Sequence, residues 1–459
     1  MSATDGATDR YSRVFGAYDI RGIVGADIDS ALVRAIARAY GEYVCPDRQG
    51  HFLIGRDGRW SSAAFAEAAS FGLRECGHRI THIGVASTPM IYWYGAEAGF
   101  DGSIAISASH LHPNYNGMKL CRSDAMPLSS EEGLPEIADM LRRPRAACER
   151  QSSELVRHVS VLADYASEIR RHLKPSRPVR LAVDAGNGMG GLATESVLGP
   201  SDSIDLWPLN FRPDPRFPVR PSNPLEPGAL DELAATVKKR GLEFGVAFDG
   251  DADRAVAVDE RGVLVPPDVL GGLIALHVLK ASPGAAIVHD VRVSRAIPEL
   301  IKEAGGRPVP SRVGHAFIKR LMRETQALFA MELSGHYYYS DLHYTDNGER
   351  TLVELANLVS FSEQTLSLLA KPLQRYPTSG EINLEVQDRA GLLVNLEQMY
   401  KDGNLGHLDG LSVDYPDWWF NARLSNTEPV VRINMGAVND DLLGKRRDEL
   451  MQRIERIAA

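Results

Sequence analysis

Two patterns of hydrophobic residues alternate along most of this chain. In residues 30–44, apolar side chains recur at intervals of three and four, which places them on one face of a helix. The run HFLIG at 51–55 is largely apolar, as in a buried strand. A second helical pattern follows, with Ser61 or Ser62 as its N-cap, and ITHIGV at 80–85 predicts the next strand. This alternation predicts a largely parallel sheet with helices on both faces.

The alternation restarts after segments that favour a break. RRPRAACERQSSE at 142–154 has the composition of a linker, and a strand that runs into a glycine-rich turn follows at 179–191. KPLQRYP at 371–377 precedes a final block of shorter elements. We therefore predict an α/β fold of three consecutive α/β domains with mixed, largely parallel sheets, plus a C-terminal α+β domain, around a central cleft. The expected domains are residues 1–155, 156–258, 259–370 and 371–459.

The composition is that of a soluble globular protein, with 44% hydrophobic and 24% charged residues. The net charge of −9 argues against nucleic acid or an anionic membrane as the main partner. No apolar run approaches the roughly 18 residues of a membrane span, and the polar N-terminus has no signal core. Four cysteines without metal-ligand spacing fit reduced thiols. We expect a cytoplasmic protein, monomeric or weakly homo-oligomeric, that binds small molecules, with no nucleic acid or membrane partner.

The most informative segment is DGDADR at 249–254. Asp249, Asp251 and Asp253 alternate, Arg254 follows, and apolar strand-like runs flank them. Three carboxylates this close repel one another unless a cation neutralises them, and oxygen ligands suit a hard ion such as Mg²⁺. The segment therefore predicts a metal site for phosphate chemistry.

Two other interpretations of this segment stay open. Aspartates at positions 1, 3 and 5, with Glu260 at position 12, match part of a calcium-binding EF-hand loop, so a calcium-binding module without catalysis is an alternative. Arg254 stands where that loop needs glycine, and the flanks read as strands rather than helices. A solvated acidic turn is the other alternative.

A second polar loop follows the short apolar strand at 104–106. Ser109 and His110 lie just beyond its end, where α/β sheets bind ligands, and Lys119 comes later in the same segment. Ser109 is either a nucleophile or a turn serine. A hydrolase triad is disfavoured, because His110 is adjacent in sequence and no G-x-S-x-G elbow surrounds the serine.

MELSGH at 331–336 follows a strand-like run. Glu332 and Ser334 are two residues apart, so both side chains project the same way from an extended segment. A carboxylate beside a hydroxyl suits paired sugar hydroxyls. A strand end that bonds to its own loop explains the pattern equally well.

RLSNTEPVVRI at 423–433 combines hydroxyl and amide groups with two positive charges. Such a cluster can hold a phosphate, whereas a structural turn with surface arginines is the alternative. The residues concerned are Arg423, Ser425, Asn426, Thr427 and Arg432.

GNGMGG at 186–191 matches the dinucleotide fingerprint G-x-G-x-x-G. The acidic residue expected at the end of the next strand is missing, because that strand ends in Asn210 and has Asp205 near its start. Nicotinamide binding is therefore disfavoured.

Taken in their order along the chain, the motifs resemble those of the α-D-phosphohexomutase family, and they span nearly the whole sequence. SASH resembles its phosphoserine loop, DGDADR its metal loop, MELSGH its sugar-binding loop and RLSNTEP its phosphate-binding loop. Leu333 and Asn426 look more like phosphomannomutase/phosphoglucomutase members than phosphoglucosamine mutases. Further matching segments are FGAYDIRG (15–22), GRDGRWSS (55–62), STP (87–89) and GHAFIK (314–319).

The resemblance implies an isomerase, an intramolecular phosphotransferase of the phosphomannomutase/phosphoglucomutase type. It would interconvert hexose 6-phosphate and hexose 1-phosphate, with mannose and also glucose as expected sugars, through a phosphoserine enzyme and a 1,6-bisphosphate intermediate. The implied cofactors are Mg²⁺ and hexose 1,6-bisphosphate as activator, and the partners are sugar phosphates. Phosphoglucosamine mutase activity is the nearest alternative.

The resemblance also implies roles for individual residues. Phosphorylated Ser109 would hold Mg²⁺ together with Asp249, Asp251 and Asp253. The other residues with an implied part in catalysis are Arg21 and Arg254, which would contact the phosphate, and Lys119 and His336, which would move protons. The substrate-binding set would be Tyr18, Arg312, Glu332, Ser334, Arg423, Ser425, Asn426, Thr427 and Arg432.

The chain departs from the family pattern at four places. Leu111-His112 stand where the family has Asn-Pro, which leaves the course of the serine loop open. Elsewhere Met331 replaces a usual glycine, Arg312 a usual lysine and Gly436 a usual glutamate. None of these changes removes an implied metal ligand.

Overall fold

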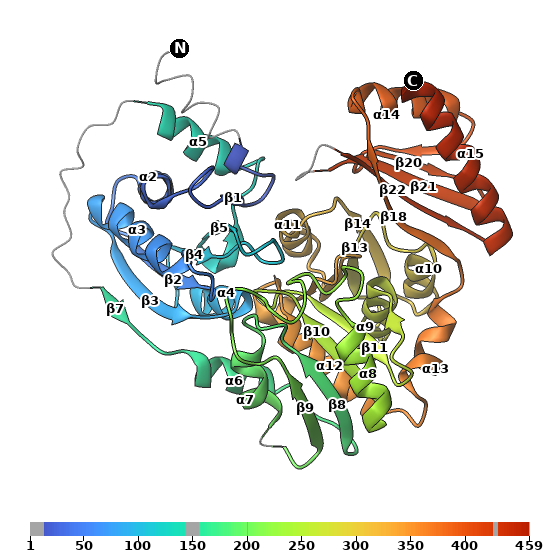
Figure 1. Ribbon diagram of the computed structural model, residues 1–459, viewed down its shortest axis with the longest axis horizontal. Coiled ribbons are helices and arrows are strands. Elements are labelled where there is room, and N and C mark those ends of the chain that lie inside the picture. The colour runs from blue at the N-terminus through green and yellow to red at the C-terminus, as the bar shows by residue number, and fades with distance from the viewer. Residues whose placement is uncertain (1–12, 144–155, 200, 426–429, 459) are drawn as a thin grey trace. The chain divides into compact units, whose positions relative to one another are not determined.

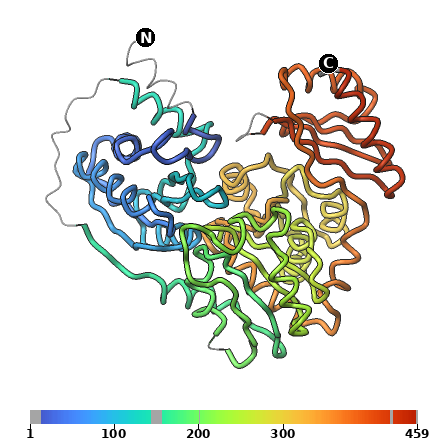
Figure 2. The backbone as a smooth tube through the Cα atoms, viewed as in Figure 1, coloured from blue at the N-terminus to red at the C-terminus, as the bar shows by residue number. Residues whose placement is uncertain are grey.

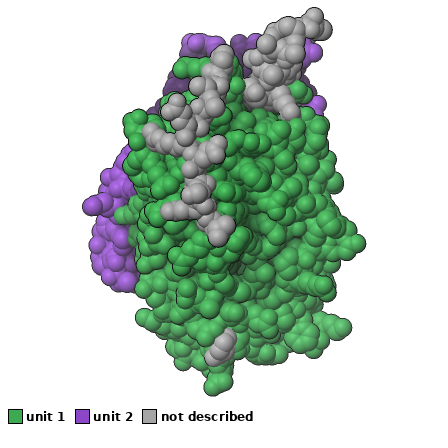
Figure 3. Space-filling view, turned by 90° about the vertical axis from the view of Figure 1, so that its left-hand side faces the viewer, with its two compact units in different colours: residues 1–265, 334–367 green, residues 266–333, 368–459 purple. Residues whose placement is uncertain are grey.

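A computed structural model describes residues 13–143, 156–199, 201–425 and 430–458 of the chain (Figure 1). The chain forms two compact units, which are described separately. Unit 1 comprises Met1–Val265 and Ser334–Ser367, and unit 2 comprises Pro266–Leu333 and Leu368–Ala459 (Figure 3). The course of the backbone can be followed in Figure 2. Among the described residues, no helix is long and apolar enough to cross a membrane.

The first sheet of unit 1 is mixed, with strand order β1-β5-β4-β2-β3-β7 and β6 paired to β5. Strand β2 is parallel to β3 and β4, whereas β5 is antiparallel to both β4 and β1. The strands are β1 (Ile20–Ile23), β2 (His51–Arg56), β3 (Arg79–Val85), β4 (Gly102–Ile106), β5 (Tyr115–Arg122), β6 (Met126–Pro127) and β7 (Arg157–His158). The helices are α2 (Ser30–Val44), α3 (Ser62–Glu75), α4 (Thr88–Glu97), the 3₁₀ turn η1 (Ser123–Ala125) and α5 (Leu134–Arg142).

The two helices predicted first from the hydrophobic pattern form and pack against each other. Helix α2 has the predicted bounds, and the Asp29 side chain caps it by accepting a 2.8 Å hydrogen bond from the Leu32 amide. Ser61 is the N-cap residue of α3, as one of the two predicted serines, but its side chain makes no capping hydrogen bond. Its hydroxyl instead accepts a 2.7 Å hydrogen bond from the Asn116 side chain. The Ser62 hydroxyl donates to Asp57 at 2.5 Å.

The second sheet of unit 1 has the order β12-β11-β10-β8-β9. Strand β8 is parallel to β9 and β10, whereas β11 is antiparallel to β10 and β12. Leu233 and Val237 of α8 are fully buried in a cluster with residues of these strands. The elements are α6 (Leu162–Arg170), β8 (Val179–Asp184), α7 (Gly191–Leu198), β9 (Ile204–Leu209), α8 (Asp231–Arg240), β10 (Phe244–Phe248), β11 (Ala255–Asp259) and β12 (Leu264–Val265).

A later segment completes unit 1. It contains the antiparallel pair β16 (Tyr337–Tyr339) and β17 (Thr345–Asp346), joined through the 3₁₀ turn η2 (Ser340–Leu342), and then helix α12 (Gly348–Ser360). The Asn347 side chain caps α12 by accepting from the Arg350 amide at 2.8 Å. The first residue of this helix, Gly348, also donates its amide to the Ala252 carbonyl at 3.1 Å. The start of α12 therefore supports the turn between β10 and β11.

Unit 2 begins with a parallel arrangement in which β13 lies between β14 and β15. Its elements are α9 (Pro267–Ala281), β13 (Ala286–Asp290), α10 (Ala296–Glu303), β14 (Arg307–Ser311), α11 (His315–Thr325) and β15 (Phe329–Met331). Helix α13 (Leu366–Ala370) and the 3₁₀ turn η3 (Lys371–Leu373) follow, and η3 falls on the predicted proline-bearing break.

The remainder of unit 2 is an antiparallel sheet with the order β18-β22-β21-β20-β19. Its core joins residues of β20, β21 and β22 with Leu392 and Leu396 of α14 and Leu450 and Ile454 of α15. The elements are β18 (Thr378–Glu385), α14 (Arg389–Met399), β19 (Asn404–Gly406), β20 (Leu411–Asp414), β21 (Trp418–Leu424), β22 (Val430–Ala437) and α15 (Asp440–Ala458).

These sheets confirm the predicted fold class of α/β domains followed by an α+β domain. The exact domain bounds stay a prediction. Residues 144–155 of the predicted linker lie outside the described residues.

Candidate functional site

The three aspartates of the predicted metal loop lie on the turn between β10 and β11, whose ends pair at Phe248 and Ala255. Their side chains are buried, and one carboxylate oxygen from each lies within 4.8 Å of the others. The flanking elements are strands, which excludes the helix–loop–helix of an EF-hand. Burial likewise excludes a solvated acidic turn.

Lys119 of β5 brings a positive charge to these carboxylates. Its ammonium donates to Asp251 Oδ2 at 2.8 Å and also to Asp253. The Thr88 hydroxyl, at the start of α4, donates to the same Asp251 oxygen at 2.6 Å. Within the described residues, Asp251 Oδ1 is buried without a hydrogen-bond partner. A buried oxygen of this kind is suited to a cation.

The pKa values of two aspartates in the metal loop are shifted in opposite directions. Burial, together with the neighbouring carboxylates of Asp253 and Asp251, raises the pKa of Asp249 well above its usual value. Burial would also raise the pKa of Asp253, but the charges of Lys119 and His336 hold it well below its usual value. The buried carboxylates of this loop are therefore stabilised by positive charge, whether from a side chain or from a cation.

Ser109 lies directly against this group. Its hydroxyl donates a 2.8 Å hydrogen bond to Asp249 Oδ2, and its backbone has a positive φ of 49°. The Ser109 amide donates to the Ser107 hydroxyl at 2.8 Å, which helps to hold the turn after β4. We call residues 107–115 the serine loop.

His110 is closer to the serine hydroxyl than its sequence position suggested. Its Nδ1 atom lies 3.2 Å from Ser109 Oγ, within hydrogen-bond distance. Burial and the positive charges of Arg254 and Arg21 lower the pKa of His110 well below its usual value, so the imidazole is neutral. The backbone turn at Ser109 brings the neighbouring ring to the hydroxyl, and a hydrolase triad stays disfavoured.

The serine loop and the metal loop approach each other at a glycine. A Cβ atom added at Gly250 would overlap the carbonyl oxygen of Ser109. The glycine-rich turn at 186–191 packs here too, because the Met189 amide donates to the Gly250 carbonyl at 3.0 Å. A Cβ at Gly186 would overlap the Arg220 guanidinium. These glycines make room for the chain itself, which counts against a dinucleotide site.

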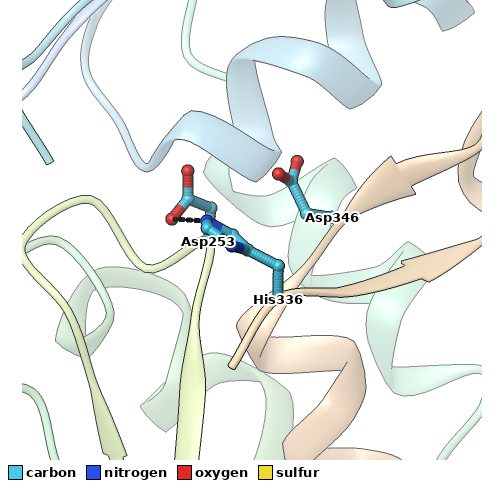
Figure 4. A group of neighbouring side chains, drawn as sticks. All are labelled: Asp253, His336 and Asp346. Atoms are coloured by element: carbon cyan, nitrogen blue, oxygen red, sulfur yellow. Dashed lines mark ion pairs between the residues drawn. The ribbon is translucent and has the colours of Figure 1, made fainter. Parts of the chain in front are cut away.

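Arg254 and His336 border the metal loop. The Arg254 amide donates to Asp249 Oδ1 at 3.2 Å, and its Nε atom lies 3.7 Å from Asp249 Oδ2. His336 Nε2 lies 3.3 Å from Asp253 Oδ1, and its Nδ1 atom lies 2.9 Å from the Ser334 hydroxyl. Asp346 of β17 adds a further buried carboxylate beside them (Figure 4), and one ligand atom each of Asp253, His336 and Asp346 lies within 4.8 Å of the others.

Arg21 and Tyr18 lie at the start of the first sheet. Arg21 is on β1, its side chain is 15% exposed, and it pairs with Asp19 at 2.6 Å. Despite burial, which lowers it, the pKa of Arg21 is raised by Asp19 and Tyr18. Tyr18 is half-buried just before β1.

Two of the predicted substrate residues of unit 2 surround the start of α11. Glu332 is buried and accepts a 3.0 Å hydrogen bond from the Gly314 amide. The Arg312 guanidinium lies 4.0 Å from the centre of the Phe317 ring. The expected projection of Glu332 and Ser334 from an extended strand is wrong, because β15 ends at Met331 and a turn follows.

Two further predicted substrate residues of unit 2 belong to a cluster of arginines. Arg423 and Arg432 are opposite each other on β21 and β22, and both contact Glu381 of β18, at 3.1 and 3.4 Å. Arg292, which sequence analysis missed, lies 3.7 Å from Glu381 and 3.8 Å from Glu332. Its place just beyond the end of β13 was the available signal.

The predicted phosphate loop between these two strands is described only at its start. The Ser425 amide donates to the Val430 carbonyl at 3.0 Å, which closes the loop. Asn426 and Thr427 lie outside the described residues.

The structure thus brings the predicted catalytic and metal residues together within unit 1. The substrate residues of unit 2 gather around α11 and around Glu381. Besides Arg292, sequence analysis gave no role to Thr88 or Asp346. Thr88 belongs to the STP segment, which was noted without a function.

Comparisons with known proteins agree along nearly the whole chain. Models of the phosphoglucomutase/phosphomannomutase family match in order. Its alpha/beta/alpha domains I, II and III match residues 12–146, 162–262 and 266–376, and its C-terminal domain matches residues 381–453.

Individual relatives cover nearly the full length. A phosphomannomutase of Escherichia coli is 34% identical over 448 residues, which are 95% of this chain and 97% of that protein. A protein of Xanthomonas campestris pv. campestris named for phosphohexose mutases is 36% identical, with 96% and 99% covered.

Among solved structures, a phosphoglucomutase/phosphomannomutase family protein from Burkholderia thailandensis superposes with a TM-score of 0.88 at 30% identity. The match covers 97% of each chain. Four matching domains and full-length relatives leave one assignment: this chain belongs to the phosphoglucomutase/phosphomannomutase family and is an isomerase of the phosphohexomutase type.

Proposed function

We propose that this chain interconverts hexose 6-phosphate and hexose 1-phosphate, with mannose and glucose as its sugars, through a phosphorylated Ser109. The observation that carries the proposal is the 2.8 Å hydrogen bond from the Ser109 hydroxyl to Asp249. A turn serine without chemistry would not need a buried carboxylate group as its neighbour. The relatives named phosphomannomutase support the choice of mannose.

The residues around Ser109 fit a magnesium ion. Asp249, Asp251 and Asp253 offer oxygen ligands only, and Asp251 Oδ1 has no hydrogen-bond partner within the described residues. These three carboxylates and Ser109 would hold the ion. Bound Mg²⁺ would supply positive charge that stabilises the transferring phosphoryl group.

In the proposed first transfer, a sugar hydroxyl attacks the phosphorus of phospho-Ser109. The bond from phosphorus to the serine oxygen breaks, a bond to the sugar oxygen forms, and the hydroxyl proton moves to a nearby base. We assign uptake of this proton to His336, which is held by Asp253. The ammonium of Lys119, held by Asp251 and Asp253, is assigned to donate a proton to the sugar oxygen that leaves in the second transfer. Arg254 and Arg21 supply positive charge for the phosphate.

The resulting hexose 1,6-bisphosphate turns end for end, and its other phosphate returns to Ser109. The bisphosphate is therefore both intermediate and activator. Either end of the sugar must fit the same groups, so we assign the non-reacting phosphate to the arginines around Glu381 in unit 2. Arg423, Ser425, Asn426, Thr427 and Arg432 form this proposed clamp. Glu332, Ser334, Arg312 and Tyr18 are proposed to contact the sugar.

A coupled assay on three sugars tests the proposal. Mannose 1-phosphate, glucose 1-phosphate and glucosamine 1-phosphate are each supplied with Mg²⁺ and a trace of glucose 1,6-bisphosphate. We expect turnover of the mannose and glucose compounds and little of the third. Preferred turnover of glucosamine 1-phosphate would establish the phosphoglucosamine alternative. Tight calcium uptake without any turnover would establish a calcium-binding protein instead.

Three further expectations from the sequence belong to the same proposal. These are the domain bounds 1–155, 156–258, 259–370 and 371–459, a cytoplasmic location, and a monomeric or weakly homo-oligomeric state. Light scattering after size-exclusion chromatography tests the last of them.

A further inference from the structure

A buried arginine of unit 1, Arg59, forms hydrogen bonds with the backbone of the serine loop. Its side chain is 1% exposed and follows the turn after β2. Its two terminal nitrogens donate to carbonyl oxygens of the loop. One donates to Ser109 at 2.9 Å and Leu111 at 2.6 Å, and the other donates to His112 at 2.8 Å and Tyr115 at 3.1 Å.

The fifth N–H group of the guanidinium is also used. Arg59 Nε donates to Asp57 Oδ2 at 3.1 Å. A guanidinium has five donors in a fixed plane, so this side chain places every one of them on a protein acceptor. Such complete use is specific to arginine, because a lysine has three donors on a single atom and cannot span these carbonyls.

Asp57 and neighbouring residues hold Arg59 itself in place. Asp57 Oδ1 accepts from the Arg59 amide at 3.0 Å and from the Ser62 hydroxyl at 2.5 Å. The Asp57 amide donates to the Ile106 carbonyl at 2.9 Å, at the end of β4. The Phe217 ring lies with its centre 5.2 Å from the guanidinium carbon. The arginine is therefore anchored beside the ends of β2 and β4, and β4 leads directly into the serine loop.

We propose that Arg59 is a positioning residue for phosphoryl transfer: it fixes the backbone of the serine loop so that the Ser109 hydroxyl stays against Asp249. This inference rests on the proposed function of Ser109. Arg59 bonds to backbone carbonyl groups, so its hold on the loop is independent of which side chains stand at positions 111 and 112. It therefore holds the loop whether Leu111-His112 or the Asn-Pro of the family pattern stand there.

The test compares Arg59→Lys with Arg350→Lys. Arg350 is a matched control, because its side chain is also buried in unit 1, at 8% exposure, but it pairs with Glu354 and Asp341 and does not bond to the serine loop. Hydrogen exchange is followed by mass spectrometry in peptides covering residues 107–115. Phosphate uptake from glucose 1,6-bisphosphate with Mg²⁺ is followed by intact mass, and kcat and KM come from the coupled assay.

For Arg59→Lys we expect exchange to become at least about tenfold faster in residues 107–115 and unchanged in the rest of unit 1. The rate of phosphate uptake and kcat should both fall about 100-fold, as misplacement of a reacting group by about 1 Å can cause. KM should change less than about threefold, and Arg350→Lys should behave like the wild type. If the Arg59 variant does not fold, Asp57→Asn should give the same local pattern with a smaller, about tenfold, loss.

Two results would overturn the inference. If hydrogen exchange and kcat of Arg59→Lys equal those of the wild type, the hydrogen bonds of Arg59 to the serine loop are dispensable. Faster exchange throughout unit 1, with kcat and thermal midpoint falling together, would show that Arg59 is a general support of the fold. Absence of phosphate uptake by the wild type would instead refute the proposed function. In that case, faster hydrogen exchange confined to residues 107–115 in Arg59→Lys would still show that Arg59 holds the serine loop. Unchanged exchange there would reject that role.

Discussion

The Ser109 hydroxyl donates a 2.8 Å hydrogen bond to Asp249, a residue 140 positions later in the chain. This single contact joins the serine loop of the first sheet to the metal loop of the second. It brings the proposed phosphate carrier to the carboxylates that would hold the cation.

The first prediction concerns the cation. Asp251→Asn keeps the side-chain volume but removes the charge beside Lys119, and we expect it to weaken Mg²⁺ binding at least about tenfold, since Mg²⁺ prefers carboxylate oxygens. Isothermal titration calorimetry measures the affinity. Asp259→Asn is the control, because Asp259 is also buried but pairs with Arg261. Equal affinities in the two variants would rule out Asp251 as a ligand.

The second prediction concerns the close approach at Gly250. An added Cβ would overlap the Ser109 carbonyl oxygen, so Gly250→Ala must push the two loops apart. We expect kcat to fall about 100-fold and stability to fall by about 1–3 kcal/mol. Gly444→Ala in α15 is the matched control, because a Cβ there meets no atom within 4 Å. Full activity of Gly250→Ala would show that the loops need not stay in contact.

The third prediction concerns the phosphate clamp. Arg423→Ala removes one positive charge from the cluster around Glu381 and should raise KM by about 10–100-fold, as expected for a lost hydrogen bond to a charged group. The effect on kcat should be smaller, because this arginine acts on the phosphate that does not react. Steady-state kinetics with Arg446→Ala as a control on α15 measures both constants. An unchanged KM contradicts the clamp.

The fourth prediction concerns pH. Glu349 of α12 is fully buried, and burial raises its pKa to about 8, although the Tyr165 hydroxyl bonds to it at 3.1 Å. The unfolded chain ionises this group near pH 4.5, so the folded state binds one more proton between about pH 4.5 and 8. Its contribution to stability is therefore present below that window and is lost as pH rises through it, by up to about 5 kcal/mol.

Glu349→Gln removes this titration while retaining a neutral hydrogen-bonding group. Relative to the variant, the wild type should lose thermal stability between pH 5 and pH 8. Thermal unfolding midpoints at both pH values provide the comparison. A difference between wild type and variant that does not change with pH would show that Glu349 is already ionised in the folded protein.

Sequence reasoning succeeded where local pattern decides structure. The spacing of Leu32, Val33, Ile36 and Tyr40 predicted α2 with its observed bounds, because an amphipathic helix needs only short-range information. The aspartates of the metal loop were recognised for a similar reason, since their crowding is visible within five residues.

It failed where the pattern of residue types does not decide the structure. Ser61 is the predicted N-cap of α3, but its hydroxyl bonds to Asn116, 55 positions later, and not to the helix. The alternation at Glu332 was misapplied because the chain turns after Met331. The role of Arg59 could not be read from GRDGRWSS, since its acceptors are carbonyls of residues about 50 positions away. The 3.2 Å approach of His110 Nδ1 to Ser109 Oγ was not predicted, because the positive φ of Ser109 is not visible in the sequence.

The location of transferred phosphate tests the central claim most directly. The wild-type protein and Ser109→Ala are incubated with glucose 1,6-bisphosphate and Mg²⁺, digested, and mapped for phosphopeptides, and mutase turnover is measured on the same samples. We predict phosphate on Ser109 in the wild type, and a folded Ser109→Ala protein with neither phosphate nor turnover. Phosphate on another residue, or full turnover by Ser109→Ala, would contradict the account.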